Sequence, residues 1–194
     1  MISLFLDTST KYLCIGIAKD HKVIYKLQQE AAKQQSDLTI PFLSKALNEN
    51  GLTLNDVDEV NVTIGPGSFT GIRIGMCIAK VLASMKNIPL KAISSLNAYA
   101  SLGKKIVILD AKAKRVYLGI YNDNEKVIDE TVVEIETLKQ MLNDYPGYDV
   151  VLDSYLIGQE SEEIDVIENM NRISINLERV SNVDGLVPIY LKDR

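Results

Sequence analysis

The sequence predicts an α/β protein built from two related lobes with mixed sheets, and three observations lead to this prediction. A segment near the N-terminus recurs 103 residues later, each copy has the pattern of a strand pair, and each is followed by a helix-forming stretch and a β-type run. The 194 residues, 46% of them hydrophobic, can bury a substantial core. We expect a first lobe over residues 1–100 and a smaller, trimmed second lobe over residues 101–194. A return of the C-terminal tail to the first lobe stays an open alternative.

The repeated segment supplies the strongest evidence for two lobes. Residues 6–20 align without a gap with residues 109–123, and six of the 15 pairs are identical. Each copy has a buried strand ending in aspartate, Asp7 or Asp110, then a polar turn and a second strand. These carboxylates either position a metal ion or act as general bases, or they cap their own turns. We favour capping, because the sequence lacks the glycine beside Asp7 that would let a phosphate approach closely.

The elements between and after the two strand pairs follow from periodicity and from turn residues. A helix is expected over about residues 36–50, with Ser36 as its N-cap and Gly51 as its stop signal. Glycine suits this stop because it adopts the left-handed conformation without strain. The other expected elements are a strand over 60–64, a helix over 72–86, a helix near 135–142 and a strand near 150–152.

A glycine-dense segment, residues 65–75, joins the predicted strand to the predicted helix. Such a turn exposes backbone N–H groups at a helix N-terminus, which suits a phosphate or a carboxylate. The lysine of a nucleotide-hydrolysing loop is absent, and Thr70 stands where a dinucleotide fingerprint has its third glycine. Tight turning and close packing of the helix on the sheet explain the glycines equally well. The candidate cofactor-binding residues are Asp7, Thr8, Gly65, Gly67, Ser68 and Asp110.

The two first-lobe helices are more apolar than a single sheet requires. The apolar arc of the second helix spans roughly 220°, whereas a surface helix usually shows ~100°. Either the helices close the core by packing on each other, or one stripe binds another subunit. We favour a partner interface, because the alanine and glycine content of that stripe permits close helix approach. The expected interface residues are Leu38, Phe42, Ala46, Ile72, Gly75, Met76, Ala79 and Ala83.

Composition excludes several classes of function. The net charge is −5, with ten basic and eight acidic residues in 1–100 against 11 and 18 in 101–194, which argues against binding of nucleic acid by this chain alone. The single histidine, His21, cannot form the paired ligands of a zinc peptidase. Cys14 and Cys77 are expected to be buried thiols. Without a membrane-length apolar run or signal-peptide features, the chain is expected to be cytoplasmic.

The string GPGSFTGIRIG at residues 65–75 resembles the signature of the TsaB (YeaZ-type) family, which belongs to the tRNA threonylcarbamoyladenosine machinery. The resemblance covers most of residues 1–121 and resumes near the C-terminus, whereas residues 150–187 match weakly. Gln35 stands where the family has histidine, and Lys192 where it commonly has arginine. The other matching segments are Leu6-Asp7-Thr8-Ser9-Thr10, Ser94-Ser95-Leu96, Asp110-Ala111 with Val116-Tyr117, and Pro188-Ile189-Tyr190-Leu191.

The resemblance implies a duplicated actin/Hsp70/sugar-kinase-like (ASKHA) fold and a non-catalytic scaffold or activating subunit. Such a subunit binds TsaD, which transfers threonylcarbamoyl to adenosine in tRNAs reading codons that begin with A. It implies a heterodimer with TsaD, TsaE joining through that complex, a homodimer when alone, and contact with tRNA only through the complex. No firmly bound cofactor is implied, apart from ATP or ADP at the interface with TsaD.

Two other classes of function stay open at the level of sequence. One is a small ASKHA-fold ATPase or phosphotransferase that uses Asp7 and Asp110. The other is a self-associating regulatory protein.

Overall fold

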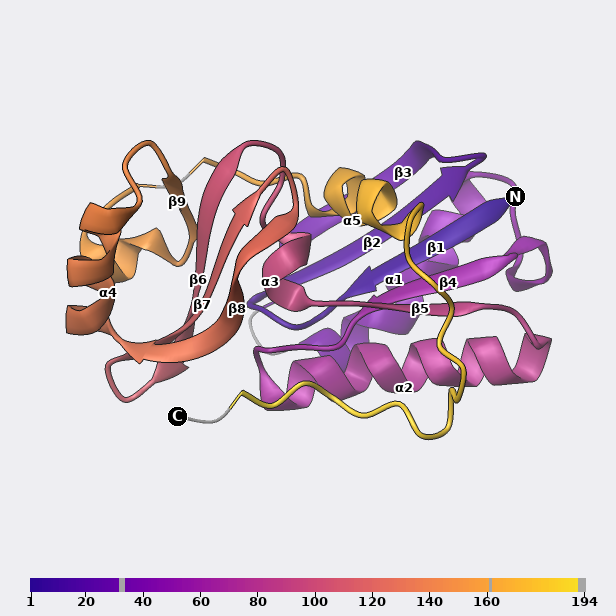
Figure 1. Ribbon diagram of the computed structural model, residues 1–194. Helices are drawn as coiled ribbons and strands as arrows, with labels where there is room; N and C mark the ends of the chain where they lie inside the picture. Colours follow the sequence, from indigo (N-terminus) through magenta and orange to yellow (C-terminus); the bar gives the residue numbers. More distant parts are fainter. Residues whose placement is uncertain (32–33, 161, 192–194) are drawn as a thin grey trace.

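The computed structural model describes residues 1–31, 34–160 and 162–191, so Lys192 lies outside the described residues (Figure 1). A five-stranded sheet forms the first lobe, in the order β3-β2-β1-β4-β5. Its first three strands are antiparallel, and β4 and β5 run parallel to β1. The strands are β1 (Ile2–Asp7), β2 (Tyr12–Lys19), β3 (Lys22–Glu30), β4 (Glu59–Thr63) and β5 (Leu90–Ile93).

The second sheet repeats this plan with one strand fewer, in the order β8-β7-β6-β9. Strand β6 pairs antiparallel with β7 and parallel with β9, just as β1 pairs with β2 and β4. The strands are β6 (Lys104–Lys112), β7 (Arg115–Asn122), β8 (Glu125–Glu134) and β9 (Asp149–Leu152). The duplicated ASKHA-like fold with mixed sheets is therefore confirmed.

The helices divide between the two faces of the first sheet and the outer side of the second sheet. Helices α1 (Gln35–Glu49) and α2 (Phe69–Lys86) cover one face of the first sheet, and α5 (Val166–Ser174) covers the other (Figure 1). The short α3 (Ser95–Ala98) lies between the lobes, and α4 (Ile135–Met141) packs on the second sheet. Three 3₁₀ turns, η1 (Leu54–Asp56), η2 (Leu142–Asp144) and η3 (Ser154–Ile157), complete the elements.

The prediction of Ser36 as the N-cap is wrong, although the helix begins at Gln35, close to the expected position. Helix α1 has Gln34 at its N-cap without a side-chain cap, and the Ser36 hydroxyl donates instead to the Asp37 carboxylate at 3.2 Å. His21 lies in the exposed turn between β2 and β3, as predicted. No helix among residues 1–31, 34–160 and 162–191 is long and apolar enough to cross a membrane.

After the second sheet, the chain returns to the first one. Helix α5 packs on strands of the first sheet, and the following tail runs along α2 (Figure 1). The tail is fixed by two main-chain hydrogen bonds, from Val180 N to Leu90 O at 2.8 Å and from Ile189 N to Ile64 O at 2.8 Å. Along the chain, the second sheet is therefore inserted between two stretches that both pack on the first sheet.

A shared hydrophobic core joins the two lobes. One buried cluster contains Phe5 and Tyr99 on the first-lobe side, Leu109 and Tyr121 from the second sheet, and Met170 from α5. Polar contacts strengthen this junction, since the largely buried Glu130 carboxylate accepts hydrogen bonds from Ser94 Oγ and from Tyr121 OH at 2.7 Å. Packed side chains, rather than a single hinge, hold the lobes together.

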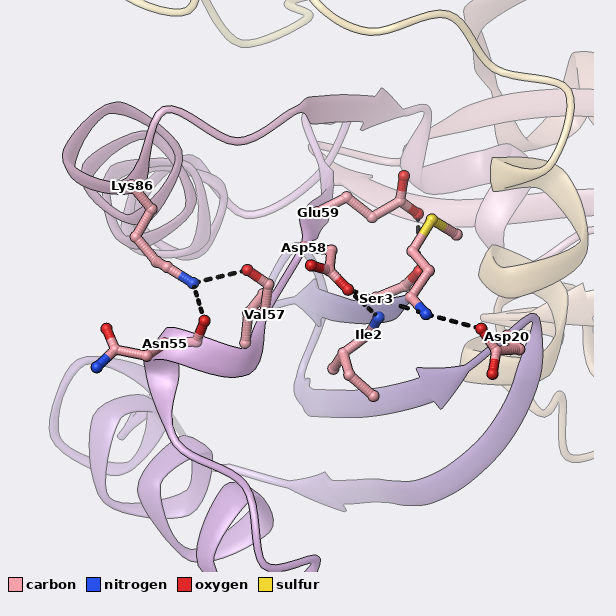
Figure 2. A network of polar contacts seen from close by, with 9 residues as sticks. Ile2, Ser3, Asp20, Asn55, Val57, Asp58, Glu59 and Lys86 are labelled. Atoms are coloured by element: carbon pink, nitrogen blue, oxygen red, sulfur yellow. Dashed lines mark hydrogen bonds and ion pairs between the residues drawn. The ribbon is translucent and has the colours of Figure 1, made fainter.

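Figure 2 shows a polar network at the end of the first sheet where the chain begins. Ile2 N donates to the Asp58 carboxylate at 2.6 Å, and Ser3 Oγ donates to Glu59 at 2.9 Å. The Lys86 ammonium donates to three main-chain carbonyls around η1 at 2.5–2.9 Å. This network fastens the C-terminal end of α2 to the loop that leads into β4.

We predict that Glu59→Gln destabilises the protein more at pH 7 than at pH 3. Burial raises the pKa of Glu59, but hydrogen bonds from Asn61, Lys91 and Ser3 outweigh it and lower that pKa below 4.5. The stabilisation is therefore present above pH 4.5 and is lost as the pH falls through the lowered pKa. Urea unfolding should give a loss of ~2 kcal/mol at pH 7.

The matched control for this substitution is Glu163→Gln, because the side chain of Glu163 is exposed. It should change the unfolding free energy by less than about 0.5 kcal/mol. An equal loss at pH 7 and pH 3 for Glu59→Gln would show that the carboxylate charge does not contribute.

Candidate functional site

The carboxylate of Asp7 is completely buried and accepts four hydrogen bonds. Its Oδ1 accepts from Ser9 N at 2.9 Å, from Ser9 Oγ at 2.5 Å and from Thr63 Oγ1 at 2.6 Å. Its Oδ2 accepts from Tyr99 OH at 2.8 Å. The bond from Ser9 N caps the turn after β1, so the capping interpretation is confirmed. Oδ1 is thus fully used by protein donors, and the burial of the whole carboxylate keeps solvent away from Oδ2.

The glycine segment packs against the turn that Asp7 caps. A Cβ at Gly71 would lie 1.9 Å from Thr8 O, and one at Gly67 would lie 2.3 Å from Ser9 O, so only glycine fits. Ser68 N donates to Ser9 O at 2.7 Å, and Ser68 Oγ caps α2 by accepting from Gly71 N at 3.2 Å. The N–H groups of Ser68 and Gly71 therefore bond within the protein instead of facing an anion.

Gly65 and Asp110 also have hydrogen-bond partners within the protein. Gly65 N donates to Ser95 Oγ at 3.1 Å, and a Cβ at Gly65 would lie 2.8 Å from Ile189 O. The Asp110 carboxylate accepts from Lys112 N at 2.8 Å and from Lys112 Nζ at 2.6 Å, which is the same kind of turn cap. Burial raises the pKa of Asp110, but the bonds from Lys112 outweigh it, and the pKa is lowered.

Two buried groups beside these aspartates were missed from the sequence. Tyr99 links Asp7 to Thr10 Oγ1 at 2.8 Å, and burial together with the Asp7 charge raises its pKa well above 10. Asp153 accepts from Asp110 N at 2.9 Å, and burial raises its pKa. The matching segment Ser94-Ser95-Leu96, just before Tyr99, was the only sequence signal near either residue.

The predicted interface residues are wrong as a set, because most of them face the first sheet. Ala46 and Ala79 have no exposed surface, and a Cβ at Gly75 would lie 2.6 Å from Thr8 Oγ1. The small side chains let α2 lie close to its own sheet rather than to another subunit. Buried with them are Ile72, Met76 and Ala83, while Leu38 and Phe42 pack against the same core.

The opposite side of α2 carries an exposed row of residues spaced four apart, which we call the α2 ridge. Phe69 is 62% exposed and Met85 is 81% exposed, which is unusual for large apolar side chains. Cys77 lies at the centre of the row and is exposed, so the prediction of a buried thiol is wrong for Cys77 and confirmed for Cys14. The α2 ridge consists of Phe69, Arg73, Cys77, Val81 and Met85.

Apolar grooves flank the α2 ridge on both sides. The groove between α1 and α2 has a volume of about 450 Å³ and includes Ile40, which is 53% exposed. The groove between α2 and the C-terminal tail has a volume of about 610 Å³ and includes Leu186 and Pro188. A ridge between two apolar grooves can interlock with a helix pair of another protein.

An aromatic and arginine cluster forms one end of the α2 ridge. The guanidinium carbon of Arg73 lies 3.3 Å from the ring centre of Phe69 and 5.6 Å from that of Tyr190. The two rings are 5.9 Å apart, so the tail contributes directly to this surface. Arginine and aromatic side chains are the types most often found at interface hot spots.

The duplicated sheets define an ASKHA-class protein, in which the Asp7 carboxylate is buried and the α2 ridge is exposed. Within the described part of the chain, no group of three His, Cys, Asp or Glu side chains is placed to hold a metal ion.

Comparisons with known proteins identify the family. Residues 26–165 match the family model described as TsaD, tRNA N6-adenosine threonylcarbamoyltransferase. The tRNA threonylcarbamoyladenosine biosynthesis protein TsaB of Bacillus subtilis (strain 168) is 31% identical over 218 residues, covering 99% of this chain and 94% of that protein. The TsaB protein of Buchnera aphidicola subsp. Schizaphis graminum is 32% identical over 153 residues, covering 73% and 72%. The chain belongs to the TsaB (YeaZ-type) family.

A solved structure agrees with the fold. YeaZ from Pseudomonas aeruginosa superposes with a TM-score of 0.77 at 20% identity, covering 98% of this chain and 99% of that one.

We predict that Ala79→Glu destabilises the fold itself. The new carboxylate would be buried against the sheet, which should cost more than ~3 kcal/mol in urea unfolding. Cys77→Glu, two positions earlier on the exposed side, should cost less than about 0.5 kcal/mol. A stable Ala79→Glu variant whose only defect is weaker association would restore the rejected interface.

Proposed function

We propose that this chain is a non-catalytic scaffold subunit in tRNA threonylcarbamoyladenosine biosynthesis. It binds TsaD and holds it in an active arrangement while TsaD transfers threonylcarbamoyl to adenosine in tRNAs reading codons that begin with A. The observation that carries the proposal is a contrast. The Asp7 carboxylate is buried and accepts four hydrogen bonds within the protein, whereas the apolar α2 ridge is exposed. The names of the curated relatives support the pathway.

The state of the two aspartates argues against the alternative, an ATPase or phosphotransferase. An enzyme of that kind needs a carboxylate free to bind a metal ion or to accept a proton. Four protein donors hold Asp7, and Lys112 neutralises Asp110 at the end of the other sheet. The core shared by the lobes further disfavours the opening and closing of a cleft between them.

The similarity of the chain to the TsaD family model suggests how the two proteins pair. Two chains with the same first-lobe fold can pack their α1 and α2 helices around a pseudo-two-fold axis. The i, i+4 spacing of the α2 ridge suits the commonest class of helix packing. TsaE then joins through the pair, and two copies of this chain form a homodimer when TsaD is absent.

Contact with tRNA and with nucleotide is assigned to the complex rather than to this chain alone. With a net charge of −5, the chain leaves the phosphate contacts of tRNA to its partners. It holds no cofactor firmly by itself, and the boundary with TsaD is the one place where the proposal admits ATP or ADP.

We predict that Val81→Glu weakens the complex with TsaD by at least about tenfold, because it buries an unpaired charge in the docking face. Val81 is 49% exposed, so folding should be unaffected. Glu163→Ala on the second lobe is the control and should bind normally. Dissociation constants from calorimetry, with reconstituted threonylcarbamoyl transfer as a second readout, decide the outcome. Normal binding by Val81→Glu would place the docking face elsewhere.

We also predict that the purified chain alone turns over ATP no faster than buffer does. Asp110→Asn is the informative variant if turnover is found, because Asp110 is partly exposed near the end of β6 and the amide is isosteric with the carboxylate, so the change should not unfold the protein. Turnover that vanishes in Asp110→Asn, with an unchanged circular dichroism spectrum, would establish the enzyme alternative.

A further inference from the structure

Helix α2 carries basic residues but no acidic residue over its whole length. Its charged residues are Arg73, Lys80 and Lys86. The Lys80 ammonium donates to two tail carbonyls at 2.8 and 3.2 Å, and Lys86 donates to carbonyls around η1. These bonds fix both side chains in place, but a carbonyl does not cancel a positive charge.

Arg73 differs from the two lysines because no residue in the described part of the chain accepts a hydrogen bond from it or pairs with its charge. Its guanidinium stacks on Phe69, with Tyr190 close by. Stacking covers a face of the guanidinium plane but leaves the N–H groups at its edge free. Among residues 1–31, 34–160 and 162–191, Arg73 is thus an ordered cation without a charge partner in an otherwise apolar row.

The surrounding residues preorganise this cation. Tyr190 is held in place because the preceding residue, Ile189, donates its N–H to Ile64 O at 2.8 Å, and Lys80 fastens the tail two turns further along α2. Because these side chains are already ordered, less conformational entropy is lost when a partner binds. The planar edge of a guanidinium matches a carboxylate, which accepts two parallel N–H···O bonds.

We infer that Arg73 determines the choice of partner at the docking face by pairing with a carboxylate on the facing helices of TsaD. The inference rests on the proposed function and names the chemistry that the partner must present. A carboxylate opposite Arg73 adds charge complementarity to an apolar contact, which favours that partner over chains without an acid there.

A second copy of this chain is the poorer partner at the same face. A two-fold axis through the ridge centre at Cys77 brings Arg73 of one copy opposite Val81 and next to Lys80 of the other copy. Positive charges then meet positive charges, and α2 offers no acid to compensate them. Like-charge contacts disfavour the wrong partner in specific interfaces. The homodimer should therefore give way to the heterodimer.

Two acidic residues define the competing arrangement. Asp184 on the tail lines the groove between α2 and the tail, and Asp37 on α1 follows Ser36, which lines the groove between α1 and α2. If a second copy were the intended partner of Arg73, Asp37 or Asp184 would have to supply the carboxylate. Both can be tested by conversion to asparagine.

The experiment compares the salt dependence of the two associations. Dissociation constants of the homodimer and of the complex with TsaD are measured from about 50 to about 500 mM NaCl, a range over which exposed ion pairs become screened. We expect the complex to weaken by about tenfold or more, whereas the homodimer keeps its affinity or tightens. Arg73→Ala should weaken the complex by about tenfold, flatten its salt dependence and leave the homodimer no weaker.

Two further variants separate charge from geometry. Arg73→Lys keeps the charge without the planar fork, so it should restore the salt dependence but only part of the affinity. Arg179→Ala removes an exposed arginine away from the ridge and should change neither association.

Each outcome has a distinct meaning. Absence of a complex with TsaD at every salt concentration would overturn the proposed function together with the inference. A complex that Arg73→Ala leaves unchanged would overturn the inference alone. A homodimer that is weakened by Arg73→Ala and equally by Asp37→Asn or Asp184→Asn would show that Arg73 serves self-association.

Discussion

The buried carboxylate of Asp7 is the interaction on which the rest of the structure depends. It joins the end of β1 to β4 through Thr63, to the following turn through Ser9, and to the lobe junction through Tyr99. Four neutral donors stabilise the buried carboxylate by hydrogen bonding, and loss of one of them would leave it buried with too few hydrogen bonds. The turn that it caps is also the surface on which the N-terminus of α2 packs.

This constraint links the buried turn at Asp7 to the proposed docking face. Glycines at 67, 71 and 75 lie against the Asp7 turn and fix the rotation of α2 about its axis. Their side of the helix is buried, so the residues on the opposite side are presented outward as the α2 ridge. The contacts of these glycines with the Asp7 turn thus determine which side chains a partner can reach. The C-terminal tail adds Tyr190 to that surface.

Much of the fold was predictable from the sequence, whereas the site was predictable only in part. The repeat of residues 6–20 and the strand-glycine-helix order predicted the central strands of both sheets and the positions of α1 and α2, but not the edge strands β3, β5 and β8. Periodicity gives the angular position of each residue around α2, but it does not say which arc faces the sheet. Small residues suit a contact with the sheet as well as a contact with another subunit. The predicted interface residues were therefore assigned to the wrong side of the helix. Helix α5 was missed because its contacts on the first sheet join residues distant in sequence. Tyr99 was missed because a hydrogen bond across 92 residues leaves no local pattern.

The central claim, that the α2 ridge is the docking face for TsaD, can be tested directly through the two cysteines. Cys77 is exposed at the ridge centre, and Cys14 is completely buried and serves as an internal control. The rate of alkylation at each peptide is measured by mass spectrometry, with and without saturating TsaD. The account predicts that TsaD slows alkylation of Cys77 by at least about tenfold, since a well-packed interface core excludes reagent and water, while Cys14 stays unreacted. An unchanged rate at Cys77 in the saturated complex would contradict it.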